Sequence, residues 1–289
     1  ALDFKRNDVE AMPSDSISVS FVNGAVRSSE QLEMVKLLRL KSQIIIAFGS
    51  CAHLGGIPGL ANMFNAQDMF NEVYIRSPGV NNLEKVLPKN QTSVPQGELT
   101  LPTMWNTVKT LDQVIKVDYY LPGCPPPVKL IKDAVNTILK GNLPAKGAVL
   151  APDIALCEEC PHRDSKPEKL ALREFRRPSE ITVDEENCLL AQGLLCMGPV
   201  TRKGCGAACV VANMPCTGCM GPTSLVKDYG AKMLSAIASI VDSKNEKDII
   251  DAFDNIADPV GTLYRYSLPA SLIHRYYQAG IHKEDLHGP

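Results

Sequence analysis

The chain has 289 residues, of which 45% are hydrophobic, enough for one large domain or two smaller ones with cores of their own. Thirty Lys and Arg residues nearly balance 32 Asp and Glu residues, and a net charge of -2 gives no global field that would attract nucleic acid or an anionic membrane. We therefore expect no nucleic-acid partner. Because the apolar runs are all shorter than a bilayer-spanning helix, we also expect no membrane anchor.

The first part of the chain alternates patterns typical of strands and helices. Residues 17–22 predict a strand, residues 29–40 a helix, and residues 43–48 a largely apolar, buried parallel strand. This last strand ends at Gly49-Ser50-Cys51. The stretch from about 77 to 104 has a weak pattern with Pro and Asn residues, and we expect it to be a surface loop.

A second strand-to-helix unit follows this loop. Residues 114–120 predict a strand that ends near Cys124, and apolar residues at helical spacing from Val128 predict a helix that stops at Gly141. Cys51 and Cys124 therefore both follow predicted parallel strands. The carboxyl ends of such strands are where α/β sheets place their ligands.

The composition changes beyond Gly147. Cys, Gly and Pro dominate up to about Pro222, and we expect this segment to depend on a bound group for its order. Residues 229–241 and 249–256 then predict helices. We assign residues 1–147 to a parallel-sheet α/β domain and residues 148–289 to a loop-rich, cysteine-rich domain with helices at its end.

Cysteine is the most unusual feature of the composition, because eight of the ten cysteines lie between residues 157 and 219. They form four groups: Cys157 and Cys160, Cys188 and Cys196, Cys205 and Cys209, and Cys216 and Cys219. A disulfide framework is one interpretation, but it belongs to small secreted domains. Two C-x-x-C pairs in a longer chain favour metal binding.

Eight thiolates satisfy two different kinds of metal site. Two cubane [4Fe–4S] clusters need four thiolates each, and two tetrahedral zinc sites would use the same residues. The glycines and prolines beside the ligands favour iron–sulfur clusters, because they let backbone N–H groups approach the sulfur atoms. Zinc remains the alternative, in which the chain is a scaffold or assembly protein.

Cys51 and Cys124 are too few to hold a cubane by themselves. Either they are packed as small hydrophobic side chains without metal, or two further ligands come from sequence preceding Ala1.

Several of these motifs resemble a known family. The runs 49–52 (GSCA) and 121–126 (LPGCPP) resemble ligand motifs of the small (iron–sulfur, gamma) subunits of [NiFe]-hydrogenases. The resemblance implies a flavodoxin-like first domain in which Cys51 and Cys124 bind a proximal [4Fe–4S] cluster. It also implies that a C-x-x-C upstream of residue 1 supplies the other two ligands.

The resemblance also sorts the remaining eight cysteines. It implies a distal [4Fe–4S] cluster at Cys157, Cys160, Cys188 and Cys196, and a medial [4Fe–4S] cluster at Cys205, Cys209, Cys216 and Cys219. The runs 47–59 and 187–198 look closest to the cytoplasmic methyl-viologen-reducing (F420-non-reducing) group of these hydrogenases.

The function implied is electron transfer within a hydrogenase, an oxidoreductase. Hydrogen is split at a Ni–Fe centre in a separate large subunit, so we expect no catalytic residue in this chain. Electrons would pass through its clusters to an iron–sulfur subunit and heterodisulfide reductase. Alternatives within this class are the small subunit of a deazaflavin-coenzyme-reducing hydrogenase or of a sulfhydrogenase.

Overall fold

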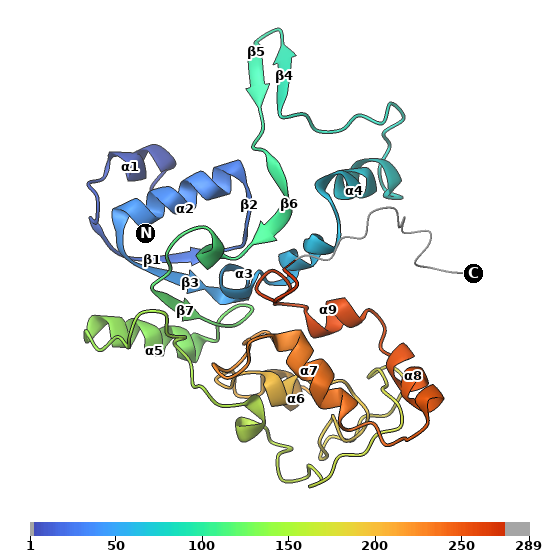
Figure 1. Ribbon diagram of the computed structural model, residues 1–289. Coiled ribbons are helices and arrows are strands. Elements are labelled where there is room, and N and C mark those ends of the chain that lie inside the picture. Colours follow the sequence, from blue (N-terminus) through green and yellow to red (C-terminus); the bar gives the residue numbers. More distant parts are fainter. Residues whose placement is uncertain (1–2, 275–289) are drawn as a thin grey trace.

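The computed structural model describes residues 3–274, and a three-stranded parallel sheet organises its first half (Figure 1). The strands are β1 (Ile17–Asn23), β3 (Ser42–Phe48) and β7 (Tyr119–Leu121), in the order β1-β3-β7. Both neighbouring pairs are parallel. The predicted α/β class with a parallel sheet is confirmed.

Helices cover both faces of this sheet. Alternate side chains of β3 point to opposite faces and pack into two different apolar cores. Ile45 and Ala47 pack into a core shared with α2 (Ser29–Lys41), and Ile46 packs with α5 (Val128–Leu139) on the other face. A strand covered on both faces has apolar residues at successive positions, which explains the run at 44–48.

The predicted strand at 114–120 is correct only near its end. Residues Leu111–Gln113 form a 3-10 turn, η3, which Val114 and Ile115 continue with N–H bonds back to the carbonyl of Leu111. Their apolar side chains still pack against the core of the α2 face. Apolar content alone predicted a strand where the chain makes a buried turn.

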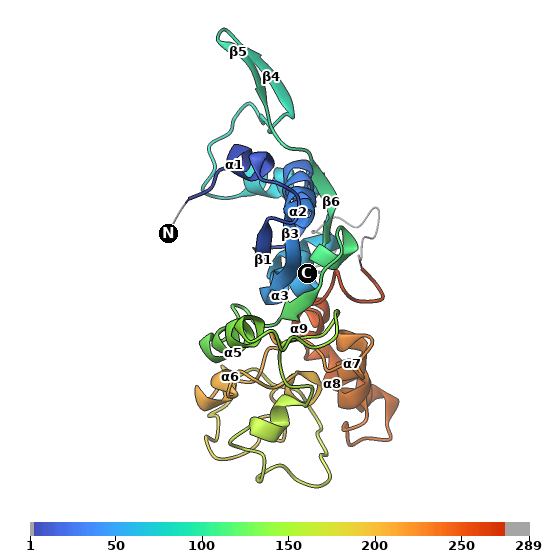
Figure 2. The same cartoon turned by 90° about the vertical axis from the view of Figure 1, so that its left-hand side faces the viewer.

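The segment expected to be a surface loop contains a β-hairpin. Strands β4 (Gln91–Val94) and β5 (Gly97–Thr100) pair antiparallel, and both are largely exposed. Figures 1 and 2 both show this hairpin standing away from the rest of the molecule. The following strand β6 (Met104–Lys109) returns to pair with β2 (Val26–Ser28).

Short helices complete the first half. They are α1 (Arg6–Ala11), α3 (Gly49–Leu54), the 3-10 helix η1 (Ile57–Met63), α4 (Ala66–Asn71) and the π-helix η2 (Glu72–Arg76). After α5, residues 148–150 lie beside β7, where the N–H of Leu150 donates to the carbonyl of Tyr120. Residues beyond 147 thus still pair with the edge of the parallel sheet at β7.

The second half has little regular structure up to residue 228. It contains the 3-10 helices η4 (Leu156–Glu159) and η5 (Gly198–Val200) and the short helix α6 (Ala208–Val211). Helices α7 (Tyr229–Ala238), α8 (Glu246–Asp254) and α9 (Pro259–Leu263) follow. The two helices expected at 229–241 and 249–256 are confirmed with shifted ends. Residues 275–289 of the second assigned domain lie outside the described residues.

The cysteine-rich segment shares an apolar core with helix α7, and the expectation that a bound group supplies its order stays a prediction. Leu194, Met197, Met233 and Ile237 are almost fully buried in this core, and the thiol of Cys196 is also part of it. Met220 packs instead with Leu130 and Ala134 of α5, which joins the two halves. Within residues 3–274, no helix has both the length and the apolar character needed to cross a bilayer.

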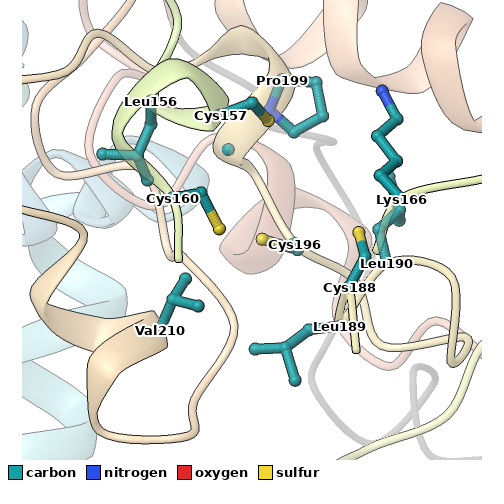
Figure 3. Close-up of a pocket in the computed structure, with 11 residues that line it drawn as sticks. Leu156, Cys157, Cys160, Lys166, Cys188, Leu189, Leu190, Cys196, Pro199 and Val210 are labelled. Carbon is teal, nitrogen blue, oxygen red and sulfur yellow. The ribbon is translucent and has the colours of Figure 1, made fainter. Parts of the chain in front are cut away.

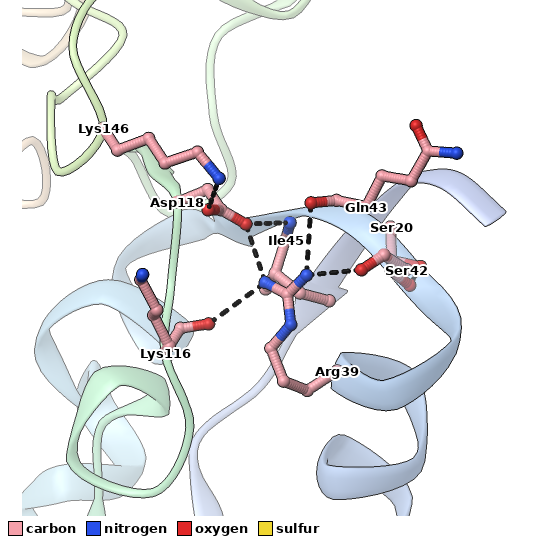
Figure 4. Close-up of polar contacts among 8 residues, drawn as sticks. All are labelled: Ser20, Arg39, Ser42, Gln43, Ile45, Lys116, Asp118 and Lys146. Atoms are coloured by element: carbon pink, nitrogen blue, oxygen red, sulfur yellow. Dashed lines mark hydrogen bonds and ion pairs between the residues drawn. The ribbon is translucent and has the colours of Figure 1, made fainter. Parts of the chain in front are cut away.

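A buried carboxylate connects the sheet to α2 and to the chain after α5 (Figure 4). Asp118 is 1% exposed, and its two oxygens lie 2.7 Å from Arg39 Nη1 and 2.7 Å from Lys146 Nζ. The N–H of Ile45 in β3 also donates to Asp118, at 2.9 Å. Burial alone would raise the pKa of Asp118, but the bonds from Lys146, Ile45 and Arg39 lower it to about 2.

Candidate metal centres

Four cysteines from separate segments line one cavity in the second half (Figure 3). They are Cys157, Cys160, Cys188 and Cys196, the set assigned to the distal cluster. Figure 3 shows the sulfur atoms of Cys160 and Cys196 pointing toward each other, with Cys188 and Cys157 at other sides of the cavity. The structure therefore brings together four thiols that span 40 positions of the sequence, 157 to 196.

Close backbone packing places two of these thiols. A Cβ atom on Gly198 would lie 3.4 Å from Sγ of Cys157 and 3.5 Å from Sγ of Cys196, so the backbone at this position is in van der Waals reach of both sulfur atoms. Burial, followed by the charge of Cys196, raises the pKa of Cys157 to about 11. Thiols in such surroundings stay protonated unless a metal centre takes the place of the proton.

The second group surrounds the start of α6. Cys205 precedes this helix, Cys209 lies in it, and Cys216 and Cys219 follow. Burial, followed by Cys205, Cys209 and Cys124, raises the pKa of Cys219 to about 11. Burial, followed by the charge of Cys196, also raises the pKa of Cys216. The charge of Cys219 raises this pKa further. The four cysteines assigned to the medial cluster are thus electrostatic neighbours.

Backbone N–H groups point at several of these sulfur atoms, as they do around metal-bound thiolates. The thiol of Cys160 accepts from the N–H of His162, and that of Cys205 accepts from Ala207 and Ala208. The thiol of Cys216 accepts from the N–H of Gly218.

Cys51 and Cys124 lie where the sequence predicted, directly after the adjacent parallel strands β3 and β7. The N–H of Ser50 donates to the carbonyl of Gly123 at 2.7 Å, which holds the two cysteine loops together. Burial, followed by Cys124, raises the pKa of Cys51. Cys124 is exposed, so packing as a buried hydrophobic side chain does not explain it.

Two hydrogen bonds join the three groups into one row. The N–H of Cys124 donates to the thiol of Cys219, and the N–H of Cys216 donates to Sγ of Cys196 at 3.4 Å. Each bond therefore runs from a cysteine of one group to a cysteine of the next. The order along the row is Cys51 with Cys124, then the medial set, then the distal set.

The structure also answers the remaining expectations for these cysteines. All ten are free thiols, so the disulfide interpretation is wrong. In the described part of the chain, no three His, Cys, Asp or Glu side chains converge closely enough to hold one metal ion.

Sequence reasoning missed two charged side chains at these sites. Glu159 binds the loop that carries Cys205, and Lys166 lines the cavity of the distal set. Nothing in the sequence distinguishes Glu158 from Glu159, although only Glu159 binds the loop that carries Cys205. Glu158 instead pairs with Arg163 at 2.7 Å.

Comparison with known proteins agrees with this arrangement. Residues 3–138 match the family model described as NADH ubiquinone oxidoreductase, 20 Kd subunit. The chain is 42% identical over 278 residues to an F420-non-reducing hydrogenase iron-sulfur subunit of Archaeoglobus profundus, covering 94% of this chain and 85% of that protein. It is 39% identical over 260 residues to the corresponding F420-non-reducing hydrogenase subunit of Methanothermobacter thermautotrophicus, covering 89% of this chain and 80% of that protein.

A solved NAD+-reducing [NiFe]-hydrogenase in the H2-reduced state is 26% identical, with a TM-score of 0.40, over 46% of this chain and 69% of that one. The sequence relatives define the class as the small, electron-transfer subunit of a hydrogenase, an oxidoreductase in which it has a large-subunit partner. Within that class, the chain belongs to the family of F420-non-reducing hydrogenase iron–sulfur subunits. The resemblance drawn from the cysteine motifs is confirmed.

Proposed function

We propose that this chain carries electrons from hydrogen oxidation in the large subunit to an iron–sulfur acceptor subunit and the heterodisulfide reductase system, in the cytoplasm. Its cysteines would hold [4Fe–4S] clusters. The medial set (Cys205, Cys209, Cys216 and Cys219) and the distal set (Cys157, Cys160, Cys188 and Cys196) would each hold one. Cys51 and Cys124 would contribute to a proximal cluster whose other ligands lie outside residues 3–274.

The observation that carries this proposal is the row of three cysteine groups. Its members come from both halves of the chain, and hydrogen bonds from Cys124 to Cys219 and from Cys216 to Cys196 link one group to the next. A relay needs such closely spaced sites, because the protein's part in electron transfer is to position its cofactors. A scaffold protein would gain nothing from placing three thiol groups in sequence.

The donor set suits iron–sulfur clusters. Four thiols surround one cavity, and N–H groups of the chain point at ligand sulfur atoms such as those of Cys160 and Cys205. Bound clusters would supply one-electron carriers whose reduction potentials depend on hydrogen bonds, net charge and exposure. The division into domains at residue 147 stays a prediction.

Metal analysis of the anaerobically purified hydrogenase tests the cofactor assignment. We expect about eight iron atoms and eight sulfides on this chain for two cubanes, and about twelve of each if a third is complete. The protein should be brown. A colourless subunit that contains zinc instead would overturn the proposal and favour the scaffold alternative.

Replacing one medial ligand tests the relay itself. Cys205→Ala should abolish dye reduction by hydrogen, because it interrupts the row, while hydrogen–deuterium exchange in the large subunit continues. The matched control is Ser239→Ala, because Ser239 is exposed and lies at the C-terminal end of helix α7 in the same half of the chain. Dye reduction at the unaltered rate in Cys205→Ala would contradict the proposed role.

A further inference from the structure

We propose that Glu159 and Lys166 set the reduction potentials of the two neighbouring clusters in opposite directions, Glu159 lowering that of the medial cluster and Lys166 raising that of the distal cluster. This inference rests on the proposed function, because it needs clusters at both cysteine sets. It assigns roles to two side chains that bind no iron. Both act as positioning and charge-bearing residues rather than as ligands.

Glu159 is bound to the loop of the medial set. Its Oε1 atom accepts three backbone N–H groups in succession, from Gly204 at 2.8 Å, Cys205 at 3.1 Å and Gly206 at 3.0 Å. The side chain comes from η4, which carries Cys157 and leads into Cys160. One carboxylate thus ties the C-x-x-C segment of the distal set to a ligand loop of the medial set.

This contact has two effects on the medial site. The three N–H groups are directed at Glu159, so they do not donate to a cluster bound at Cys205. The carboxylate also brings a negative charge beside Cys205, where burial is the main cause of the raised thiol pKa and Glu159 adds to it. A negative charge disfavours the addition of an electron, so both effects lower the reduction potential.

Lys166 lies at the distal site. It lines the same cavity as the four distal cysteines, and Figure 3 shows its side chain along one wall. The positive charge of Lys166 lowers the pKa of the Cys157 thiol, but burial raises this pKa by more. No ion pair of its amine with a carboxylate is found within residues 3–274, so no such pair neutralises its charge beside this cavity.

The two charges act on different sites, which gives the row a direction. The carboxylate of Glu159 is bound to the N–H groups of the loop that carries Cys205, whereas Lys166 lines the cavity of the distal cysteines. A lower potential in the middle and a higher potential at the outer end favour electron movement from the medial to the distal cluster. Electrons that reach the medial cluster would thus pass on to the distal cluster and be held there until an acceptor of still higher potential takes them.

Redox titration of the intact hydrogenase, followed by electron paramagnetic resonance, tests this inference. The variants are Glu159→Gln and Lys166→Gln, which keep the side-chain length and remove the charge. The controls are Glu158→Gln, which removes the same charge one residue away, and Lys169→Gln, which alters an exposed lysine of the same loop. Signals are assigned to the two sites with Cys205→Ala and Cys157→Ala.

We expect Glu159→Gln to increase the ratio of reduced to oxidised medial cluster at a set potential by about three- to tenfold, where tenfold corresponds to 59 mV for a one-electron couple. Lys166→Gln should decrease the ratio at the distal cluster by about two- to fivefold, because its more exposed charge is better screened. Each control should change the ratios by less than about twofold.

Three outcomes would overturn the inference. These are unchanged potentials in both charge variants, shifts as large in the controls, or loss of iron from Glu159→Gln, which would make Glu159 a structural clamp. Lys166 is exposed, so its variant should fold and load iron normally. A wild-type protein without iron would instead refute the proposed function, and an iron-loaded protein with unshifted potentials would refute only this inference.

Discussion

At the scale of single residues, Gly56 is the position where the backbone leaves room for the Cys51 thiol. Its φ of +59° lies in the left-handed region, and a Cβ atom there would lie 2.5 Å from Sγ of Cys51. No rotamer of a larger residue avoids this contact, because it involves the Cβ atom itself. The position of the thiol therefore depends on the absence of a side chain at residue 56.

We expect Gly56→Ala to displace Cys51 and to remove the proximal cluster alone, with iron falling from about twelve to about eight atoms per small subunit. Iron and sulfide analysis of the purified hydrogenase measures this. Gly79→Ala is the matched control, because a Cβ atom there meets nothing within 4 Å. An iron content equal to that of the wild type would show that the Cys51 site tolerates the extra carbon.

Asp118 is a residue whose charge contributes to stability. Its pKa of about 2 in the folded chain lies below its ordinary value of 3.8. A carboxyl with a lowered pKa stabilises the fold above the unfolded pKa and loses this contribution as pH falls toward the folded pKa. The shift corresponds to about 2 kcal/mol.

We expect Asp118→Asn to reduce the free energy of unfolding by about 2 kcal/mol or more at pH 7, because Arg39 and Lys146 lose their partner. The difference from the wild type should narrow as pH falls from about 4 to about 2, as measured by denaturant unfolding at each pH. Asp133→Asn, which breaks the exposed pair with Lys129, should cost less than about 1 kcal/mol throughout. A difference that stays constant with pH would contradict this account.

The identity of the site residues was predictable from sequence where residue type and spacing carry the chemistry. The strand-end positions of Cys51 and Cys124 sufficed to predict that they share a sheet edge, and the family resemblance grouped the four cysteines that line one cavity. Glu159 and Lys166 were not predictable, because a charged residue in a polar segment looks the same whether it faces water or a thiol. Only the folded loops distinguish Glu159 from Glu158.

At the scale of elements, the prediction succeeded where periodicity and end signals agree. The helix α2 begins at a capping box. Ser28 Oγ accepts from the N–H of Gln31, and Gln31 Oε1 accepts from the N–H of Ser28. The hairpin β4–β5 was missed and β7 was predicted to begin too early, because three- and four-residue strands are too short for a reliable pattern. Their pairing is decided by neighbours distant in sequence.

We expect Ser28→Ala to lower the free energy of unfolding by about 1 kcal/mol, because the first turn of α2 loses its N-cap acceptor. Denaturant unfolding followed by circular dichroism measures the change. Ser179→Ala, at an exposed position outside any helix, should change stability by less than about 0.5 kcal/mol. Equal effects of the two substitutions would mean that the cap contributes nothing.

At the scale of the whole molecule, the row of cysteines crosses from the parallel sheet into the cysteine-rich half. Met220, next to Cys219, packs into the core under α5, and a Cβ atom on Gly221 would meet Leu54 of α3 at 2.6 Å. The junction of the two halves is therefore also the junction of the first two cysteine groups. Sequence predicted the two halves from composition, but not this contact, because it joins residues far apart in the chain.

The protonated state of the partly buried thiols has a consequence for how the protein matures. Cys157 and Cys219 have pKa values near 11, so each must give up a proton when iron arrives. Assembly of the cofactors should therefore acidify an unbuffered solution and should proceed further at pH 8 than at pH 6. A pH-stat record during anaerobic reconstitution would measure the protons released per iron, and a stoichiometry of zero would mean that these sulfur atoms were already ionised in the empty chain.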